Sequence, residues 1–147
     1  MCPLIRTPRG KSYILVIADY FTRWTEAFAL PNIEARTVAE VFVFDFICRF
    51  GVPRQVHTDQ GTQFEGKLFQ EMCSLFRIDK TRTTTFHPQC DGLVESCNRT
   101  LKAMLTKFVS QTQTDWDIYL PLVLMAYRTS VHDSTGFSPS LMMSGRE

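Results

Sequence analysis

Two acidic residues in polar segments are the strongest candidates for chemistry in this sequence. Asp59 lies in the segment 57–64 and Glu95 lies in the segment 92–102, with 35 residues between them. Aspartate and glutamate oxygens are hard ligands of the kind that Mg²⁺ prefers. Each residue also has an ordinary structural explanation, Asp59 as a turn residue before Gly61 and Glu95 as a carboxylate favoured by a helix dipole. Taken singly, both residues are better explained as structural.

The elements that must position Asp59 are predicted from hydrophobic periodicity. The apolar run 13–18 predicts a buried strand, and residues 24–30 predict its antiparallel partner. Thr37 with Glu40 three residues later indicates a capping box, so a helix is expected from there to Phe50. A short β-prone stretch, 54–58, then leads to Asp59. We therefore expect the carboxylate of Asp59 at the end of a strand.

The second half of the chain is predicted to be mainly helical. A helix is predicted over 64–76, and its apolar face consists of Phe64, Leu68, Met72 and Leu75. A strand over 78–84 and a loop over 86–92 follow, and a long helix begins near Gly92 with an apolar face of Val94, Cys97, Leu101, Met104, Leu105 and Phe108. A last helix is expected from about Thr114, with Asp117 three residues on in the capping pattern and a kink at Pro121. Glu95 would then lie in the first turn of the long helix.

Basic residues follow Glu95 at helical spacing. Arg99 and Lys102 lie four and seven residues after Glu95, so all three share one helix face, with Asn98 beside them. This face could bring DNA phosphates to the acidic residues, and it could equally be an ordinary solvated face. His57 and His87 are interpreted as a strand residue and a loop residue rather than as ligands.

Composition indicates a single soluble domain without a membrane segment. The chain has 147 residues, 44% hydrophobic and 21% charged, and no apolar run long enough to span a bilayer. Its five cysteines are an odd number and have no metal-ligand spacing, so free thiols are expected. The net charge of +1 excludes a strongly basic DNA-binding protein but permits a local basic stripe.

Several motifs together resemble the integrase catalytic core of retroviruses and of gypsy-type long-terminal-repeat retrotransposons. They are the Asp59 and Glu95 segments with their spacing, residues 13–24, Phe50-Gly51-Val52-Pro53, Phe86-His87-Pro88-Gln89 and Ala126-Tyr127-Arg128-Thr129. The resemblance extends over nearly the whole chain. It implies an α/β, RNase H-like fold in which a central mixed β-sheet is flanked by helices.

The resemblance also implies a function and its residues. Asp59 and Glu95 would be catalytic residues that bind Mg²⁺ or Mn²⁺, and Asn98, Arg99 and Lys102 would contact DNA. The activity implied is DNA integration by a polynucleotidyl transferase of the two-metal type, which processes 3′ ends and transfers strands. The implied partners are DNA and further copies of the chain, as a dimer or higher homo-oligomer. The implied location is the nucleus, or the cytoplasm before nuclear entry.

The N-terminus departs from the family pattern. Cys2-Pro3-Leu4 occupies the turn that follows the family's first strand, so that strand and its metal-binding aspartate are expected ahead of Met1. We therefore expect an N-terminally truncated core over 1–130 that lacks the first strand, a weakly ordered C-terminal tail over 131–147, weak metal binding and impaired strand transfer. Asp19 is the candidate substitute for the missing aspartate, but it aligns with a strand end that is not catalytic in the family.

Two further hypotheses remain. The chain could be a catalytically inactive module of the same fold that binds nucleic acid or protein, and metal titration separates this from an integrase core. An RNase H-type nuclease shares the fold but fits the flanking motifs poorly.

Overall fold

The chain divides into two compact units. In a computed structural model, residues 4–82, 88–109 and 113–146 are described. One unit combines residues 1–31 with 92–147, and the other comprises residues 32–91. Within the described ranges, no helix has the length and apolarity needed to cross a membrane.

A β-hairpin forms the sheet of the first unit. Strand β1 (Tyr13–Ala18) pairs antiparallel with β2 (Thr25–Leu30), in a register from Tyr13 opposite Leu30 to Ala18 opposite Thr25. Both strands were predicted. The turn between them is closed by Asp19, whose Oδ2 accepts hydrogen bonds of 2.7 Å from the backbone N–H and the hydroxyl of Thr22. Asp19 thus has a turn-forming role in this hairpin.

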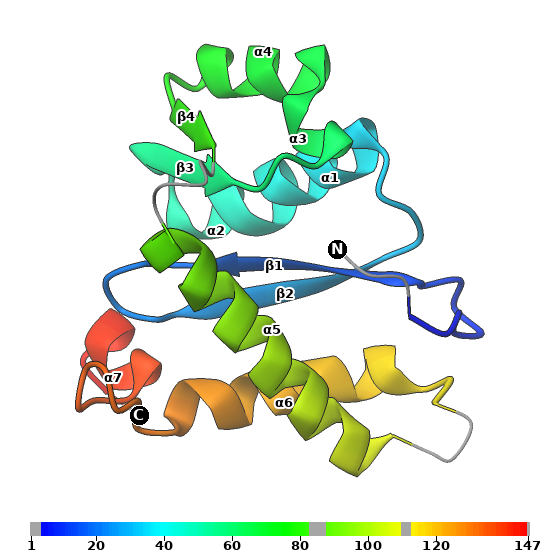
Figure 1. The fold of residues 1–147 in the computed structure, drawn as a ribbon, viewed down its shortest axis with the longest axis vertical. Coiled ribbons are helices and arrows are strands. Elements are labelled where there is room, and N and C mark those ends of the chain that lie inside the picture. The colour runs from blue at the N-terminus through cyan, green and yellow to red at the C-terminus, as the bar shows by residue number, and fades with distance from the viewer. Residues whose placement is uncertain (1–3, 83–87, 110–112, 147) are drawn as a thin grey trace. The chain divides into compact units, whose positions relative to one another are not determined.

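Two helices cover one face of this hairpin (Figure 1). They are α5 (Pro88–Phe108) and α6 (Trp116–Thr129). The buried core of the unit consists of Ala27, Cys97, Leu101, Leu105, Trp116, Leu120, Val123, Leu124 and Tyr127. Of the predicted α5 face, Val94 and Phe108 are exposed instead.

The starts of α5 and α6 differ from the predictions. Helix α5 begins at Pro88 rather than near Gly92, and proline is well tolerated at a first helical position because its missing N–H would have no partner there. The rest of the predicted loop, Phe86 and His87, lies outside the described residues. Helix α6 begins at Trp116 with Asp115 at the N-cap, so the predicted cap at Thr114 is wrong by one residue.

The C-terminal stretch contains a capped helix. In α7 (Pro139–Ser144), the hydroxyl of Ser138 accepts a 3.2 Å hydrogen bond from the N–H of Leu141, and Gly145 ends the helix at a φ of 71°. Ser138 and Pro139 are buried. Residues 139–144 of the expected tail thus form a helix, because a serine N-cap, a proline in the first turn and a C-terminal glycine are strong local signals.

The second unit begins with a continuous helical segment. It runs through α1 (Ala35–Val41), the π-helix η1 (Phe42–Ile47) and α2 (Cys48–Phe50), and Gly51 ends it at a φ of 88°. The N-cap is Glu34, so the predicted capping box at Thr37 is wrong. The predicted end at Phe50 is confirmed.

Strands β3 (Gln55–Thr58) and β4 (Asp79–Arg82) pair in parallel, with Thr58 opposite Arg82. The described strands form two two-stranded sheets, one antiparallel and one parallel. Both strand directions of the predicted α/β fold are therefore present.

Two helices rather than one connect β3 to β4. Helix α3 (Thr62–Glu65) and helix α4 (Lys67–Leu75) are separated at Gly66, which has an extended ψ of 149°. Helix α4 buries Phe69 and Cys73, whereas the predicted core residue Leu75 is 81% exposed. Apolar residues occupy neighbouring positions along this segment, so the periodicity did not distinguish two adjacent helix faces.

Candidate active site

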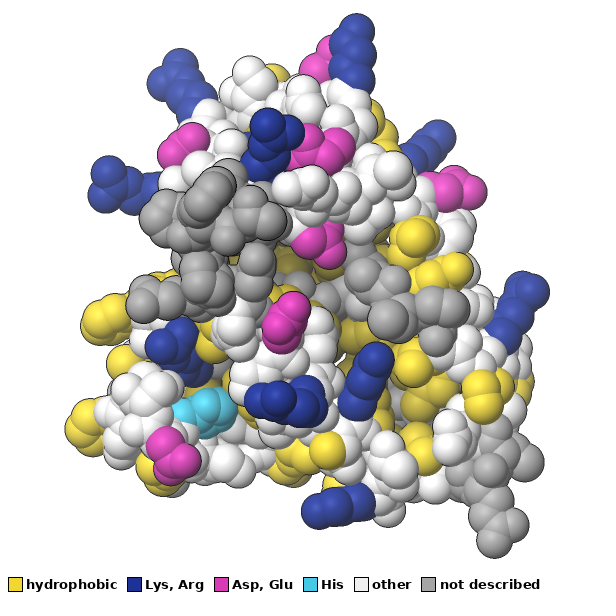
Figure 2. Space-filling view, viewed as in Figure 1, with side chains coloured by type: hydrophobic (Ala, Val, Ile, Leu, Met, Phe, Trp, Pro, Cys, Tyr) yellow, Lys and Arg dark blue, Asp and Glu magenta, His cyan; other side chains and the backbone are white. Residues whose placement is uncertain are grey.

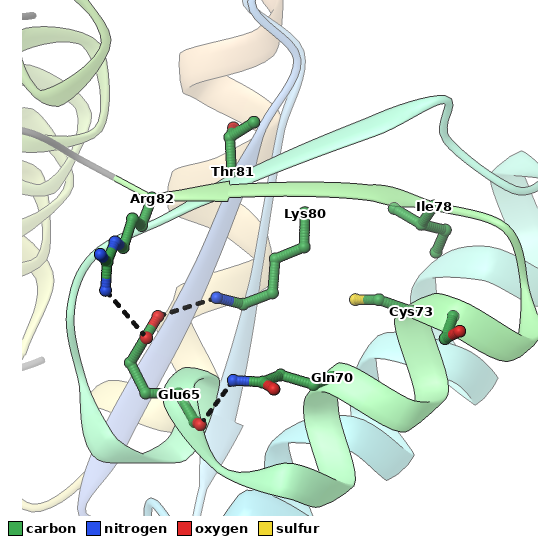
Figure 3. A pocket seen from close by; sticks show the side chains of 8 residues that line it. Glu65, Gln70, Cys73, Ile78, Lys80, Thr81 and Arg82 are labelled. Carbon is green, nitrogen blue, oxygen red and sulfur yellow. Dashed lines mark hydrogen bonds and ion pairs between the residues drawn. The ribbon is translucent and has the colours of Figure 1, made fainter.

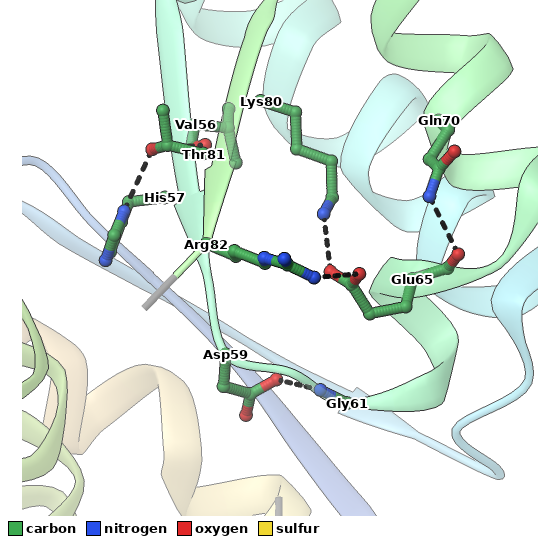
Figure 4. A network of polar contacts seen from close by, with 9 residues as sticks. All are labelled: Val56, His57, Asp59, Gly61, Glu65, Gln70, Lys80, Thr81 and Arg82. Atoms are coloured by element: carbon green, nitrogen blue, oxygen red, sulfur yellow. Dashed lines mark hydrogen bonds and ion pairs between the residues drawn. The ribbon is translucent and has the colours of Figure 1, made fainter. Parts of the chain in front are cut away.

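Asp59 lies directly after β3, in a turn that orients its carboxylate. Its Oδ1 accepts a 2.9 Å hydrogen bond from the N–H of Gly61 (Figure 4), and the side chain is exposed. A Cβ atom at Gly61 would lie 2.8 Å from the same Oδ1, which is too close for a real contact. A side chain at position 61 would therefore displace the Asp59 carboxylate, which the turn holds at the strand end, as predicted.

Glu95 lies on the exposed face of α5. Arg99 and Lys102 are exposed on the same helix, whereas Cys97 and Leu101 are buried on its other side. Asn98, between the two faces, is half-buried. The predicted arrangement of acidic and basic side chains on one helix face is thus present. On the face shown in Figure 2, lysine and arginine side chains are dispersed among acidic and neutral side chains and do not form one basic patch.

The two carboxylates belong to different units. Asp59 is part of the 32–91 unit and Glu95 is part of the other, and each is described within its own unit. Their convergence on a metal ion stays a prediction. Among the described residues, no group of three or more His, Cys, Asp and Glu side chains is arranged to hold a metal ion.

The donor chemistry at these positions nevertheless fits a hard divalent cation. Both side chains are exposed carboxylates, and one oxygen of Asp59 is already oriented by a backbone N–H. The nearby His57 has a different partner, since its Nδ1 lies 2.9 Å from the hydroxyl of Thr81 on β4. This contact agrees with the interpretation of His57 as a strand residue.

An ion-pair cluster between the end of α3 and β4 was not predicted from the sequence. Lys80 Nζ lies 2.8 Å from Glu65 Oε1, and Arg82 lies 3.8 Å from Glu65 Oε2. The hydrogen bond from Lys80 lowers the pKa of the Glu65 carboxyl. These residues line an open pocket of about 630 Å³ beside α4 (Figure 3). Because Glu65 and Lys80 are 15 residues apart and on different elements, helical or strand periodicity does not indicate this cluster.

A second ion pair gives a structural role to the motif 126–129. Arg128 on α6 lies 2.7 Å from a carboxylate oxygen of Glu26 on β2, donates a 2.8 Å hydrogen bond to the carbonyl of Thr25, and lies 4.4 Å above the ring of Trp24. The Glu26 side chain is only 5% exposed. The motif therefore joins α6 to the hairpin.

Solved structures define the class of fold. The chain superposes on a chain of the simian T-cell lymphotropic virus intasome, which was determined in complex with PP2A regulatory subunit B56 gamma. The TM-score is 0.79 and the identity 23%, and the match covers 95% of this chain and 51% of the intasome chain. The chain also superposes on the HTLV-2 integrase catalytic core domain, determined in complex with magnesium in a trimeric form, with a TM-score of 0.74 and 21% identity over 92% of this chain and 88% of that one. The fold is therefore the RNase H-like fold of integrase catalytic cores, which confirms the predicted fold class.

Sequence comparison gives the family. Residues 2–88 match the integrase core domain, and the chain belongs to that family. It is 36% identical over 135 residues to the Gag-Pol polyprotein of Walleye dermal sarcoma virus, and 27% identical over 144 residues to the retrovirus-related Pol polyprotein from transposon 412 of Drosophila melanogaster. These matches cover 91% and 98% of this chain but only 8% and 12% of the polyproteins.

Proposed function

We propose that the chain acts in DNA integration as the core of a polynucleotidyl transferase, with Asp59 and Glu95 as its metal ligands. The observation that carries the proposal is the α5 face, on which Glu95, Arg99 and Lys102 are exposed together in a member of the integrase core family. Mg²⁺ or Mn²⁺, when bound, would stabilise the attacking and leaving oxygens of a phosphodiester displacement.

The residues of the chain would perform separate tasks. The Asp59 turn would present one carboxylate in a fixed direction, and Glu95 would present another from a rigid helix. Arg99 and Lys102, with Asn98 beside them, would contact the phosphates of the DNA strand. We further propose that the chain acts as a homo-oligomer in the nucleus. Support for assembly comes from the HTLV-2 integrase core, which was determined in a trimeric form.

Calorimetric titration with Mn²⁺ tests the ligand assignment. We expect binding to the 147-residue chain that is lost in both Asp59→Asn and Glu95→Gln. Asp19→Asn tests whether Asp19 is recruited as a ligand. Glu71→Gln is a matched surface control, because Glu71 pairs with the exposed Lys67 on the same helix. Binding that survives both Asp59→Asn and Glu95→Gln would refute the assignment.

The second candidate is a catalytically inactive module that binds nucleic acid or protein. It is favoured by the exposed Arg99 and Lys102 beside Asn98 on α5, because these side chains can contact phosphates without a metal ion. On this proposal the 147-residue polypeptide binds DNA in a salt-sensitive and metal-independent manner, and strand transfer is impaired. Robust Mn²⁺-dependent strand transfer that Asp59→Asn abolishes would exclude it.

A further inference from the structure

The direction of the Asp59 carboxylate depends on the two elements that flank its turn. On one side, β3 is fixed by its parallel ladder to β4, where Thr58 is opposite Arg82. On the other side, the turn leads into α3, which has only four residues. A helix this short does not hold itself in place, so its position depends on tertiary contacts.

Glu65, the last residue of α3, provides such contacts. Its carboxylate is paired with Lys80 at 2.8 Å and with Arg82 at 3.8 Å. Lys80 and Arg82 are alternate residues of β4, so both side chains point to the same face of the strand (Figure 4). The side-chain amide of Gln70 on α4 also donates a 2.9 Å hydrogen bond to the backbone carbonyl of Glu65.

The Glu65–Lys80 pair is better shielded from water than an ordinary surface pair. The side chain of Lys80 is 13% exposed and that of Glu65 is 31% exposed. By contrast, Lys67 and Glu71 on α4 are 3.5 Å apart and 88% and 63% exposed. Exposed pairs are screened by water and contribute little, whereas a shielded pair between two elements can fix their relative position.

We propose that Glu65 is a positioning residue for Asp59. Through Lys80 and Arg82 it holds α3 against β4, and it thereby fixes the turn in which the N–H of Gly61 orients the Asp59 carboxylate. This inference rests on the proposed function, because it gives the orientation of Asp59 a purpose in metal binding.

Proton exchange of the Gly61 amide, measured by NMR on the 147-residue chain, tests the inference. In Glu65→Gln we expect this amide to exchange about tenfold faster with water, because the turn opens more often. Mn²⁺ affinity should fall about tenfold, as is typical when a group that supports a ligand is lost. Glu71→Gln is the matched control and should change neither quantity. A purely stabilising role for Glu65 predicts instead a lower unfolding midpoint with unchanged Gly61 exchange under native conditions.

The outcomes separate the inference from the proposed function. Gly61 exchange in Glu65→Gln equal to that in Glu71→Gln overturns the inference, whatever the metal affinity. Faster exchange in a chain whose unsubstituted form binds no Mn²⁺ supports the positioning role and refutes the metal site. If Glu65→Gln does not fold, Arg82→Gln gives the same test with a smaller expected increase, because Arg82 is 66% exposed and lies farther from Glu65.

Discussion

Asp59 directly follows β3 and Glu26 belongs to β2, and the surroundings of the two carboxylates suit them to different roles. Asp59 is exposed, and one of its oxygens is held by a backbone N–H. Glu26 is buried against the guanidinium of Arg128 and receives a 3.1 Å hydrogen bond from the indole of Trp24. An exposed, oriented carboxylate remains available to a metal ion, whereas a buried ion pair serves the packing of β2 against α6.

Two glycines lie near the proposed ligands, Gly61 near Asp59 and Gly92 near Glu95, and their substitution by alanine should have opposite effects on stability. Gly61→Ala places a methyl group against the amide of the buried Gln63 and 2.8 Å from Oδ1 of Asp59, so both side chains must shift. We expect a loss of about 1–3 kcal/mol of stability and weaker Mn²⁺ binding. Gly92→Ala meets no atom within 4 Å and lies inside α5, so it should stabilise the chain by about 0.5–1 kcal/mol. Urea unfolding and Mn²⁺ titration of both variants measure these effects. A Gly61→Ala variant as stable as Gly92→Ala, with unchanged Mn²⁺ binding, would contradict the packing of Gln63 and Asp59 around this turn.

Removal of Arg128 should be far more costly than removal of a surface arginine. Arg128→Ala leaves the Glu26 carboxylate buried without its cation, so we expect a loss of about 3 kcal/mol. Arg36→Ala breaks an exposed pair with Glu40 and should cost less than about 1 kcal/mol. Urea denaturation of both variants compares them directly. Equal losses would contradict the structural role assigned to the motif 126–129.

The Glu65 pair should make stability depend on pH in the acidic range. Lys80 lowers the pKa of Glu65, so the pair stabilises the folded chain above the ordinary glutamate range, and this contribution is lost as pH falls through the lowered pKa. Glu65→Gln lacks this contribution at every pH. The free energies of unfolding of the two proteins, measured by urea denaturation at decreasing pH, should therefore converge. A difference that stays constant down to strongly acidic pH would argue against the ion pair.

At the scale of elements, the long helix α5 connects the core of its unit to the proposed DNA contacts. Cys97, Leu101 and Leu105 are buried along one side and fix the rotation of the helix about its axis. That rotation exposes Glu95, Arg99 and Lys102 on the opposite side. Packing of the core thus determines which side chains can meet a ligand.

Basic residues of this face should contribute to the salt dependence of DNA binding. Arg99→Gln and Lys102→Gln are each expected to weaken binding and to lower the slope of log K against log salt by about 1, because each removes one phosphate contact. Lys67→Gln is the control, since Lys67 is equally charged and 88% exposed on α4. Fluorescence anisotropy with a labelled duplex at several salt concentrations gives the slopes. The same change in all three variants would indicate that only net charge matters.

The order and type of the elements could be predicted from the sequence where hydrophobic patterns were unambiguous. Residues 13–18 form the predicted strand because a continuous apolar run has no competing interpretation at that length. The division of one predicted helix at Gly66 could not be predicted, because the apolar residues on both sides suit a continuous helix. The starts of α1 and α6 were wrong because Thr37 and Thr114 satisfy the capping pattern without serving as caps.

Only the part of the candidate site that depends on local spacing could be predicted from the sequence. Asp59 and the α5 face follow from local spacing, so the sequence indicates them. The Glu65 cluster depends on the packing of α3 beside β4, which is a tertiary feature, and no local pattern contains it. Residues that support a site from another element are therefore the part that sequence reasoning misses.

At the scale of the whole molecule, the proposed metal site takes one carboxylate from each of the two units. Asp59 lies in the 32–91 unit and Glu95 in the other. The family and the fold place the chain among integrase cores, and the proposed chemistry requires carboxylates of both units at one ion.

Iron-directed cleavage measures this convergence most directly. Fe²⁺ that replaces Mg²⁺ generates hydroxyl radicals in the presence of ascorbate and peroxide, and these cut the backbone near the bound ion. We predict two sets of fragments, with ends near residues 59 and 95, both suppressed by excess Mg²⁺ and both lost in Asp59→Asn. Cleavage at one of the two positions without the other, or at neither, would contradict a shared metal site.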